Sequence, residues 1–256
     1  MYKKKSLNKK IIYDIGSNNG DDIPYYLLKC DLVVAVEANP ELCDQIRNRF
    51  KDQISNGSLI VENCVLTESK SSNQVVFYIH KTNHVLSQFP KPIDTNQFKE
   101  VILPSKNVIE LIREHGAPYY IKIDIEHYDQ IILRELFINN IMPPYISSES
   151  HSIEIFCMLV IMGKYNAFKL VDGASVSAQY KEYEVSTNNG SIKYSFPHHS
   201  AGPFGNDISG PWITSSNFFR LLAFAGLGWK DIHASNIEKP DPNYTLQLQF
   251  NNHLNI

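Results

Sequence analysis

The 256-residue chain has only four cysteines, and no two of them form a C-x-x-C pair. This sparse spacing argues against a disulfide-stapled secreted protein and favours a reducing, cytoplasmic setting. The chain also has no large excess of charge of either sign. Its 24 Lys and Arg residues nearly balance its 27 Asp and Glu residues, which gives a formal net charge of −3. The balance excludes the strongly basic surface of a general nucleic-acid binder, so we expect no nucleic-acid partner.

Long apolar runs are absent as well. The longest, residues 155–162, falls far short of the roughly 20 residues that a helix needs to cross a bilayer, so no membrane span is expected. The basic start, MYKKKSLNKK, precedes only a short apolar stretch, which is not the pattern of a signal peptide. We therefore expect a soluble globular protein with a basic, mobile N-terminus over residues 1–10.

Short β-rich runs alternate with helical patterns, which is typical of an α/β fold with a largely parallel sheet. Strands are predicted at residues 11–15, 32–37, 58–65, 74–80, 119–124, 145–149, 168–171 and 229–235. Helices are predicted at residues 21–29, 40–50, 107–115, 129–137, 153–162 and 214–225. No linker divides the chain, so we predict a single domain over 1–256. It includes a long substrate-side loop excursion at 173–212 and a polar C-terminal tail at 236–256.

The strongest motif is the glycine-containing loop after the first strand, YDIGSNNG at residues 13–20. It lacks the G-x-G-x-x-G spacing of dinucleotide-binding folds, and residues 11–28 contain three acids but no Lys or Arg. A pyrophosphate would be repelled there, whereas a cationic ligand that carries a ribose would fit. Glu37, at the end of the second strand, is placed to accept hydrogen bonds from ribose hydroxyls. The alternative interpretation is a glycine turn with acidic helix-capping residues.

Three blocks in order, YDIGSNNGDD, VVAVEANPELC and YYIKIDIEHYDQIILREL, resemble those of FkbM-type S-adenosylmethionine-dependent methyltransferases. The resemblance extends from residue 11 to residue 149. It implies a Rossmann-like class I methyltransferase fold, with a mostly parallel seven-stranded sheet flanked by helices. It also implies S-adenosyl-L-methionine as the cofactor and O-methylation of a small-molecule or glycan acceptor.

Carried onto this sequence, the resemblance implies which residues would surround each part of the cofactor. The methionine part would lie against Asp14, Gly16, Ser17, Asn18 and Gly20. Glu37 would hold the ribose, and the adenine would lie beside Ala38, Asn63 and Cys64. Asp124 and Glu126 match the family's K-I-D-I-E block after the fourth strand. The family usually has glycine next, and His127 stands there instead, which alters the acceptor pocket and offers a further base.

A sugar hydroxyl is a poor nucleophile at neutral pH, so a general base or a metal ion would assist its methylation. Asp124 ends the predicted strand at 119–124 and Glu149 the one at 145–149, with His151 two residues later. Because neighbouring parallel strands end at one edge of a sheet, we predict that these three catalytic candidates meet there. The same groups suit Mg²⁺, and the sequence leaves base catalysis and metal assistance both open.

Histidines outside these blocks are candidates for acceptor contacts. His198 and His199 lie in the long excursion, and His80 and His84 border a strand near Ser87. Two other functions are weighed against O-methylation. A non-catalytic S-adenosylmethionine-binding protein is conceivable because of His127, and a nicotinamide-dependent oxidoreductase is disfavoured by the acidic glycine loop.

Overall fold

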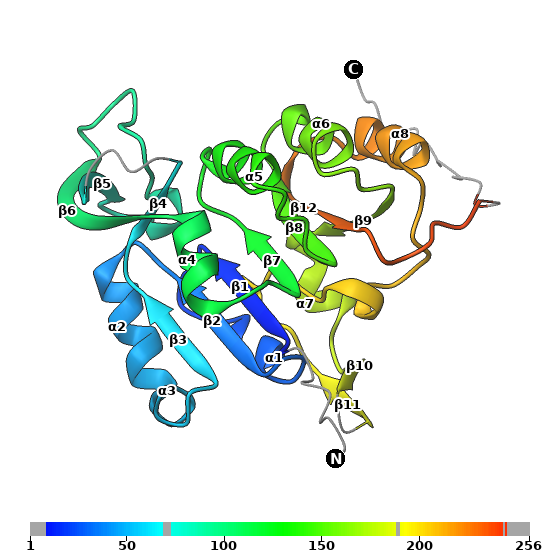
Figure 1. Cartoon of the computed structure of the whole chain (residues 1–256), viewed down its shortest axis with the longest axis horizontal. Coiled ribbons are helices and arrows are strands. Elements are labelled where there is room, and N and C mark those ends of the chain that lie inside the picture. The colour runs from blue at the N-terminus through cyan, green and yellow to red at the C-terminus, as the bar shows by residue number, and fades with distance from the viewer. Residues whose placement is uncertain (1–8, 69–72, 188–189, 243, 245–256) are drawn as a thin grey trace, which may run out of the picture.

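A seven-stranded sheet forms the centre of the computed structural model, which describes residues 9–68, 73–187, 190–242 and 244 (Figure 1). Its strands lie in the order β3 (Leu59–Glu62), β2 (Leu32–Val36), β1 (Ile11–Ile15), β7 (Tyr120–Ile123), β8 (Tyr145–Ser150), β12 (Gly228–Ser235) and β9 (Ala167–Asp172). The first five are parallel, and β12 is antiparallel to both of its neighbours. The predicted mostly parallel seven-stranded sheet is confirmed.

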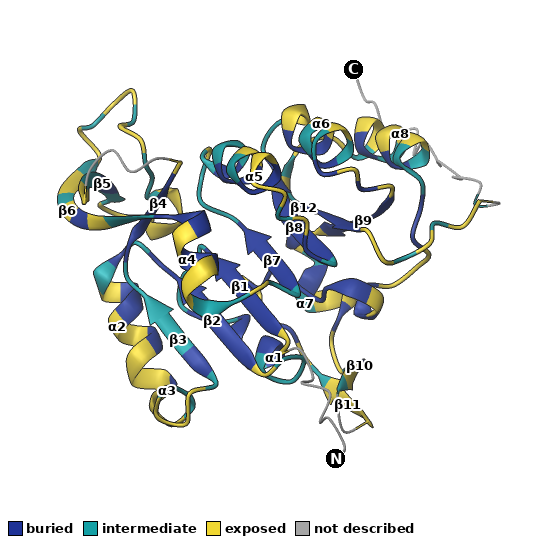
Figure 2. Cartoon of the chain, in the orientation of Figure 1, coloured by how far each residue is buried: buried dark blue, intermediate teal, exposed yellow. Residues whose placement is uncertain are grey.

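Helices cover both faces of this sheet. The eight helices of the described residues are α1 (Ile23–Leu27), α2 (Pro40–Arg49), α3 (Lys51–Ser55), α4 (Val108–His115), α5 (Asp129–Ile138), α6 (Ile153–Ile161), α7 (Val176–Gln179) and α8 (Ser215–Ala225). In β1, Ile11 and Tyr13 pack with α4 and α5, whereas Ile12 packs with α1 and α2, as the two-residue period of a strand requires. All of β1 is buried, because both of its faces are covered (Figure 2).

Side-chain caps set the start of three helices. Asn39 accepts a hydrogen bond from the backbone N–H of Glu41 at the start of α2, and Asn107 does the same for α4. Thr214 accepts from the backbone N–H of Asn217 at the start of α8. None of the described helices is long and apolar enough to cross a membrane. All four cysteines are free.

A small sheet branches off after β3. It contains β4 (Val65–Thr67), β5 (Gln74–His80) and β6 (Phe98–Asn107), in the order β4-β6-β5, with a 3₁₀ turn at His84–Leu86. The predicted strand 58–65 is therefore two strands, because the chain leaves the central sheet at residue 63. The sequence analysis missed β6, the middle strand of this sheet, because it is broken by charged residues and a proline and only two of its ten residues are buried.

Residues 173–212 form more structure than the predicted loop excursion. They contain α7, two 3₁₀ turns and a hairpin of β10 (Tyr183–Thr187) and β11 (Gly190–Tyr194). Phe196, Phe204 and Trp212 are buried in the same core as α1. The Ser, Asn and Gly content of this segment suggested an irregular loop, but its aromatic residues pack it onto the sheet. Most of the predicted N-terminal segment and most of the predicted C-terminal tail lie outside the described residues.

Candidate functional site

A cavity of about 550 Å³ opens where β1, β2, β7 and β8 end. Segments that are far apart in the sequence meet around it: the loop after β1, the start of α2, the end of β7 and the small sheet. In open α/β sheets, ligands bind at this carboxyl edge. Eight of the predicted site residues line the cavity, namely Gly16, Asn18, Glu37, Ala38, Cys64, Asp124, Glu126 and Glu149.

The glycine loop is held against the end of β2 and packs tightly on β7. The backbone N–H groups of Gly16 and Ser17 donate to the carbonyl oxygen of Val36 at 2.9 and 3.0 Å. Gly16 has φ +84°, and a Cβ atom there would lie 1.8 Å from the carbonyl oxygen of Asp124. Only glycine fits this position, so the loop can bring its backbone to the cavity.

Glu37 joins the glycine loop to the start of α2. Its Oε2 accepts from the backbone N–H of Asn18 at 2.8 Å, and its Oε1 accepts from that of Asn39 at 2.7 Å. Burial raises the pKa of Glu37 to about 7, although these hydrogen bonds oppose the shift. Each carboxylate oxygen has more than one acceptor position, so Glu37 can still receive hydroxyl donors from the cavity.

Of the three residues predicted to lie beside the adenine, two line the cavity and one supports the backbone behind it. Ala38 and Cys64 line the cavity, together with Leu42. Asn63 does not line it; instead, its Nδ2 donates to the carbonyl oxygens of Glu37 and Ala38 at 3.0 and 2.9 Å. Asn63 therefore fixes the segment that carries the acid.

Three other loop residues predicted to contact a cofactor lie beneath the cavity instead of lining it. Asp14 is fully buried, and burial raises its pKa. Ser17 donates its hydroxyl to the carbonyl oxygen of Asp14 at 2.7 Å, and Gly20 packs against Ile46. These three residues shape the loop from below. A sequence motif alone does not show which of its residues support the loop and which line the cavity.

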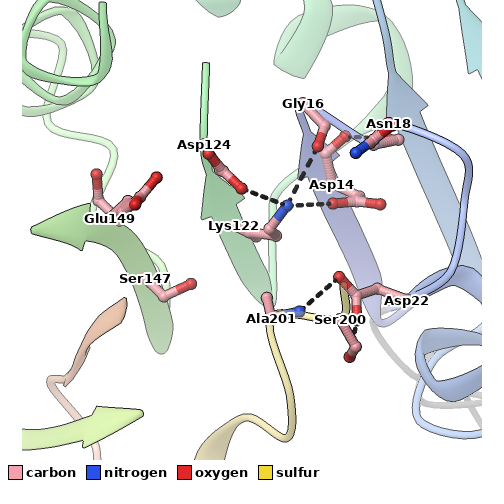
Figure 3. Close-up of polar contacts among 12 residues, drawn as sticks. Asp14, Gly16, Asn18, Asp22, Lys122, Asp124, Ser147, Glu149, Ser200 and Ala201 are labelled. Carbon is pink, nitrogen blue, oxygen red and sulfur yellow. Dashed lines mark hydrogen bonds and ion pairs between the residues drawn. The ribbon is translucent and has the colours of Figure 1, made fainter. Parts of the chain in front are cut away.

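Lys122 is a site residue that the sequence analysis missed. Its Nζ lies 3.3 Å from Asp124 Oδ2 and 3.6 Å from Asp14 Oδ1, and it donates to the carbonyl oxygen of Gly16 at 3.2 Å (Figure 3). Burial lowers the pKa of Lys122, but the surrounding carboxylates, Asp124 first among them, raise it well above its ordinary value. The sequence feature that could have identified Lys122 is its position between Ile121 and Ile123, in a strand that is buried along its whole length.

Four side chains meet at the ends of β7 and β8. Ligand atoms of Asp124, Glu126, Glu149 and His151 all lie within 4.8 Å of one another. The structure thus brings together the three residues predicted to be catalytic and adds Glu126. This group of four residues is called the rim cluster below.

The rim cluster contains one ion pair, between His151 Nε2 and Glu149 Oε2 at 3.0 Å. Its hydrogen bond to Glu149 raises the pKa of His151 to about 9, against the effect of burial. A protonated imidazole cannot accept a proton, so the carboxylates are the candidate bases at neutral pH. Burial raises the pKa of both Glu126, to about 7, and Glu149.

His127 keeps the backbone conformation that glycine would favour. Glu126 and His127 both have positive φ, +49° and +69°. Such angles in non-glycine residues cost energy and cluster at functional sites. The His127 ring is exposed, does not line the cavity, and lies 5.0 Å from the ring of His151, centroid to centroid.

The remaining cavity wall comes from the small sheet, from the connection between β5 and β6, and from two residues in the last quarter of the chain, His199 and Trp229. Of the histidines predicted for acceptor contacts, His84 and His199 line the cavity, whereas His80 and His198 do not. Trp229 also lines it, with its ring stacked on His199 at 6.5 Å. Further lining residues missed from the sequence include Asn83, Val85, Phe89 and Tyr128. Among the described residues, the lining includes four acids and no Lys or Arg.

Comparison with known proteins relates the chain to methyltransferases. A family model described as "Methyltransferase FkbM domain" matches residues 14–169. No curated protein matches the chain. A solved FkbM methyltransferase from Methylobacillus flagellatus KT is similar in structure, with 17% sequence identity and a TM-score of 0.44. The match covers 66% of this chain and 43% of that one, so this chain corresponds to less than half of the Methylobacillus protein.

A second solved structure is the C-terminal domain of precorrin-6Y C5,15-methyltransferase from Rhodobacter capsulatus. It is 8% identical, with a TM-score of 0.41, and the match covers 90% of this chain and 82% of that one. The precorrin-6y C5,15-methyltransferase from Geobacter metallireducens GS-15 is 9% identical, with a TM-score of 0.39 and coverage of 90% and 81%.

Proposed function

The chain belongs to the FkbM methyltransferase family, and from this premise we propose that it methylates a hydroxyl oxygen of a sugar, glycan or natural-product acceptor with S-adenosylmethionine. The observation that carries the proposal is the cavity at the carboxyl edge of the sheet, where Glu37 and the glycine loop lie beside the rim cluster. One end of this cavity suits a ribose-bearing cation, and the other offers carboxylates for an acceptor.

The residues present fit the cofactor. Glu37 would accept hydrogen bonds from the ribose hydroxyls, and Ala38, Leu42 and Cys64 would provide an apolar wall for the adenine. The backbone of Gly16, Asn18 and Asn19 would contact the methionine part. The acidic lining without Lys or Arg favours a cationic sulfonium over a pyrophosphate. Bound S-adenosylmethionine supplies an electrophilic methyl group on sulfur.

Activation of the acceptor would fall to the rim cluster. Glu149 would take the proton of the acceptor hydroxyl as the oxygen–methyl bond forms and the sulfur–methyl bond breaks. Glu126 and Asp124 are neighbouring carboxylates that would hold the acceptor or share that proton. His151, protonated and paired with Glu149, would orient the base. A positioned base contributes roughly 10²- to 10⁴-fold to such a rate.

A divalent metal ion at the rim cluster is a second way to activate the hydroxyl. Three carboxylates and an imidazole within 4.8 Å of one another form a chemically suitable donor set. Metal binding would require His151 to lose its proton. Methyl transfer that stops after EDTA treatment and returns with Mg²⁺ or Mn²⁺ would support the metal; transfer unaffected by EDTA would support the carboxylate base.

Calorimetric titration with S-adenosylhomocysteine tests the cofactor site directly. We expect micromolar binding by the unmodified protein and roughly 10- to 100-fold weaker binding by Glu37→Gln, because a charged acceptor in the ribose contact becomes neutral. Glu41→Gln, an exposed change in the first turn of α2, is the matched control. Equal binding by Glu37→Gln and the unmodified protein would contradict the role of Glu37.

Turnover is then measured as S-adenosylhomocysteine release across a panel of sugar and polyol acceptors. Release with a hydroxyl acceptor supports O-methylation. Cofactor binding without release on any acceptor favours the non-catalytic alternative. Tight NADH binding in a fluorescence titration, with no binding of S-adenosylhomocysteine, would favour the oxidoreductase and overturn the proposal.

A further inference from the structure

The segment that carries His199 is fastened to the end of the glycine loop. Asp22 lies two residues after Gly20 and directly before α1. Its Oδ2 accepts from the backbone N–H of Ala201 at 3.1 Å, and its Oδ1 accepts from the hydroxyl of Ser200 (Figure 3). Asp22 and Ser200 are both buried, so these hydrogen bonds do not compete with water.

Helix α1 extends this connection along the same segment. The hydroxyl of Tyr25 accepts from the backbone N–H of Phe204 at 3.2 Å and donates to Asp207 Oδ2 at 2.8 Å. Lys29 Nζ lies 2.7 Å from the same carboxylate oxygen. The segment from residue 200 to residue 207 is therefore held by α1, the element that begins where the glycine loop ends.

Asp22 thus connects two segments that line different parts of the cavity wall. On its N-terminal side, Asn18 and Asn19 of the glycine loop line the cavity. Asp22 is hydrogen-bonded to Ser200, and the residue before Ser200 is His199, which lines the cavity together with Trp229. Asp22 itself does not line the cavity. Two neutral acceptor groups could make the same contacts without the energetic cost of burying a carboxylate.

We propose that Asp22 is a positioning residue that couples occupancy of the glycine loop to the placement of the wall formed by His199 and Trp229. A cofactor that orders residues 16–20 would thereby order the acceptor side of the cavity. This inference rests on the proposed function for its ligand, S-adenosylhomocysteine, and not on the identity of the acceptor. By linkage, an acceptor that orders the wall would tighten cofactor binding by the same factor.

Hydrogen exchange measured by mass spectrometry, with and without S-adenosylhomocysteine, tests the coupling. In the unmodified protein we expect the ligand to slow exchange in peptides covering residues 196–207 by about fivefold or more, a typical coupling. In Asp22→Asn we expect the ligand still to bind within about threefold of the original affinity, while this protection is lost. The neighbouring Asp21→Asn is the matched control and retains the protection: its carboxylate pairs with exposed Arg49 and accepts from Asn19 Nδ2 at 2.9 Å, and asparagine keeps an acceptor for Asn19.

The inference would be overturned if the ligand protected residues 196–207 of Asp22→Asn as strongly as those of the unmodified protein. It would also be overturned if Asp21→Asn lost this protection to the same extent as Asp22→Asn. If Asp22→Asn does not fold, Ser200→Ala removes one hydroxyl partner of the same carboxylate and is expected to reduce the protection. Ligand that binds the unmodified protein without protecting residues 196–207 also overturns it. Absence of ligand binding to the folded, unmodified protein contradicts the proposed function instead, so the two failures are distinguishable.

Once an acceptor is known, Asp22→Asn should raise the KM for that acceptor more than it lowers kcat.

Discussion

Individual charged residues at this site owe their properties to burial more than to position in a motif. Glu37, Glu126 and Asp22 each have a pKa raised by burial, to about 7, 7 and 6, respectively. Removing a carboxylate from water disfavours its charged form, and one buried lysine, Lys122, cannot compensate all of them. Acids that titrate near neutral pH are suited to accept a proton there.

Glu149→Gln tests the proposed base. The substitution keeps the shape of the side chain and removes its ability to accept a proton. We expect methyl transfer to fall roughly 10²- to 10⁴-fold, with S-adenosylhomocysteine affinity unchanged within a few-fold. The measurement is single-turnover methyl transfer beside a calorimetric titration. A rate within threefold of the original would assign proton removal to another group; Glu154→Gln, an exposed change on α6, is the control.

Lys122→Met tests the charge beneath the glycine loop. Methionine has a similar length but leaves buried Asp14 and the nearby Asp124 without their cation. Breaking one partner of a buried ion pair costs about 3–5 kcal/mol, so we expect the free energy of unfolding to fall by that amount. Urea denaturation followed by circular dichroism measures it. A loss under about 1 kcal/mol would show that Asp14 is protonated without Lys122 and needs no partner.

At the scale of elements, the site depends on how one strand end meets the next. The loop after β1 approaches the end of β7 so closely that residue 16 has no room for a side chain. The connection between β5 and β6 adds His84 and Phe89 to the cavity wall, although the small sheet that carries it is no part of the central sheet. The sequence indicated the loop through its glycines and named His84 as a candidate for acceptor contact, but it did not predict β6 or the separate small sheet that brings this region to the cavity.

Gly16→Ala separates close packing from backbone conformation. A Cβ atom at residue 16 would overlap the carbonyl oxygen of Asp124, so β1 and β7 must move apart. Gly57→Ala is the matched control, because Gly57 has a similar φ of +77° but no atom within 4 Å of an added Cβ. We expect the control to lose about 1–2 kcal/mol from its positive φ alone.

The Gly16 variant should lose clearly more than the control, together with binding of S-adenosylhomocysteine. Thermal unfolding compares the two variants, and calorimetry compares their binding. Equal destabilisation, with binding kept in both, would show that the close approach to β7 does not constrain the loop.

At the scale of the whole molecule, buried acids tie stability to pH. Burial raises the pKa of Asp129 to about 7, with a smaller contribution from Asp124. Because the folded-state pKa lies above the unfolded one, the folded protein binds more protons between about pH 4 and pH 7. The contribution of this group to stability is thus present below its unfolded pKa and is lost as the pH rises through 7.

Asp129→Asn is expected to remove this dependence. Asparagine keeps an acceptor for the hydroxyl of Ser148, which donates to Asp129 Oδ1 at 3.3 Å. The variant should gain on the order of 2 kcal/mol in free energy of unfolding relative to the unmodified protein between pH 5 and pH 8. Urea denaturation at both pH values measures the change, and exposed Asp44→Asn is the control. A difference between variant and unmodified protein that does not change with pH would contradict the prediction.

The sequence by itself determined the central sheet, the order of its motifs and the family. Buried parallel strands read as continuous apolar runs, and a tight loop requires glycine, so both features are local and visible in the linear chain. The meeting of Asp124, Glu149 and His151 was also predictable, because parallel strands end at a common edge.

Tertiary structure alone decided which motif residues face the cavity and which lie beneath it. Asp14, Ser17 and Gly20 belong to the motif but do not line the cavity, whereas Trp229, more than 200 residues away in sequence, does. The packing of residues 196–207 onto α1 likewise depends on aromatic contacts between distant segments. Burial, charge compensation and the direction of approach are properties of neighbours in space, and spacing along one chain does not specify them.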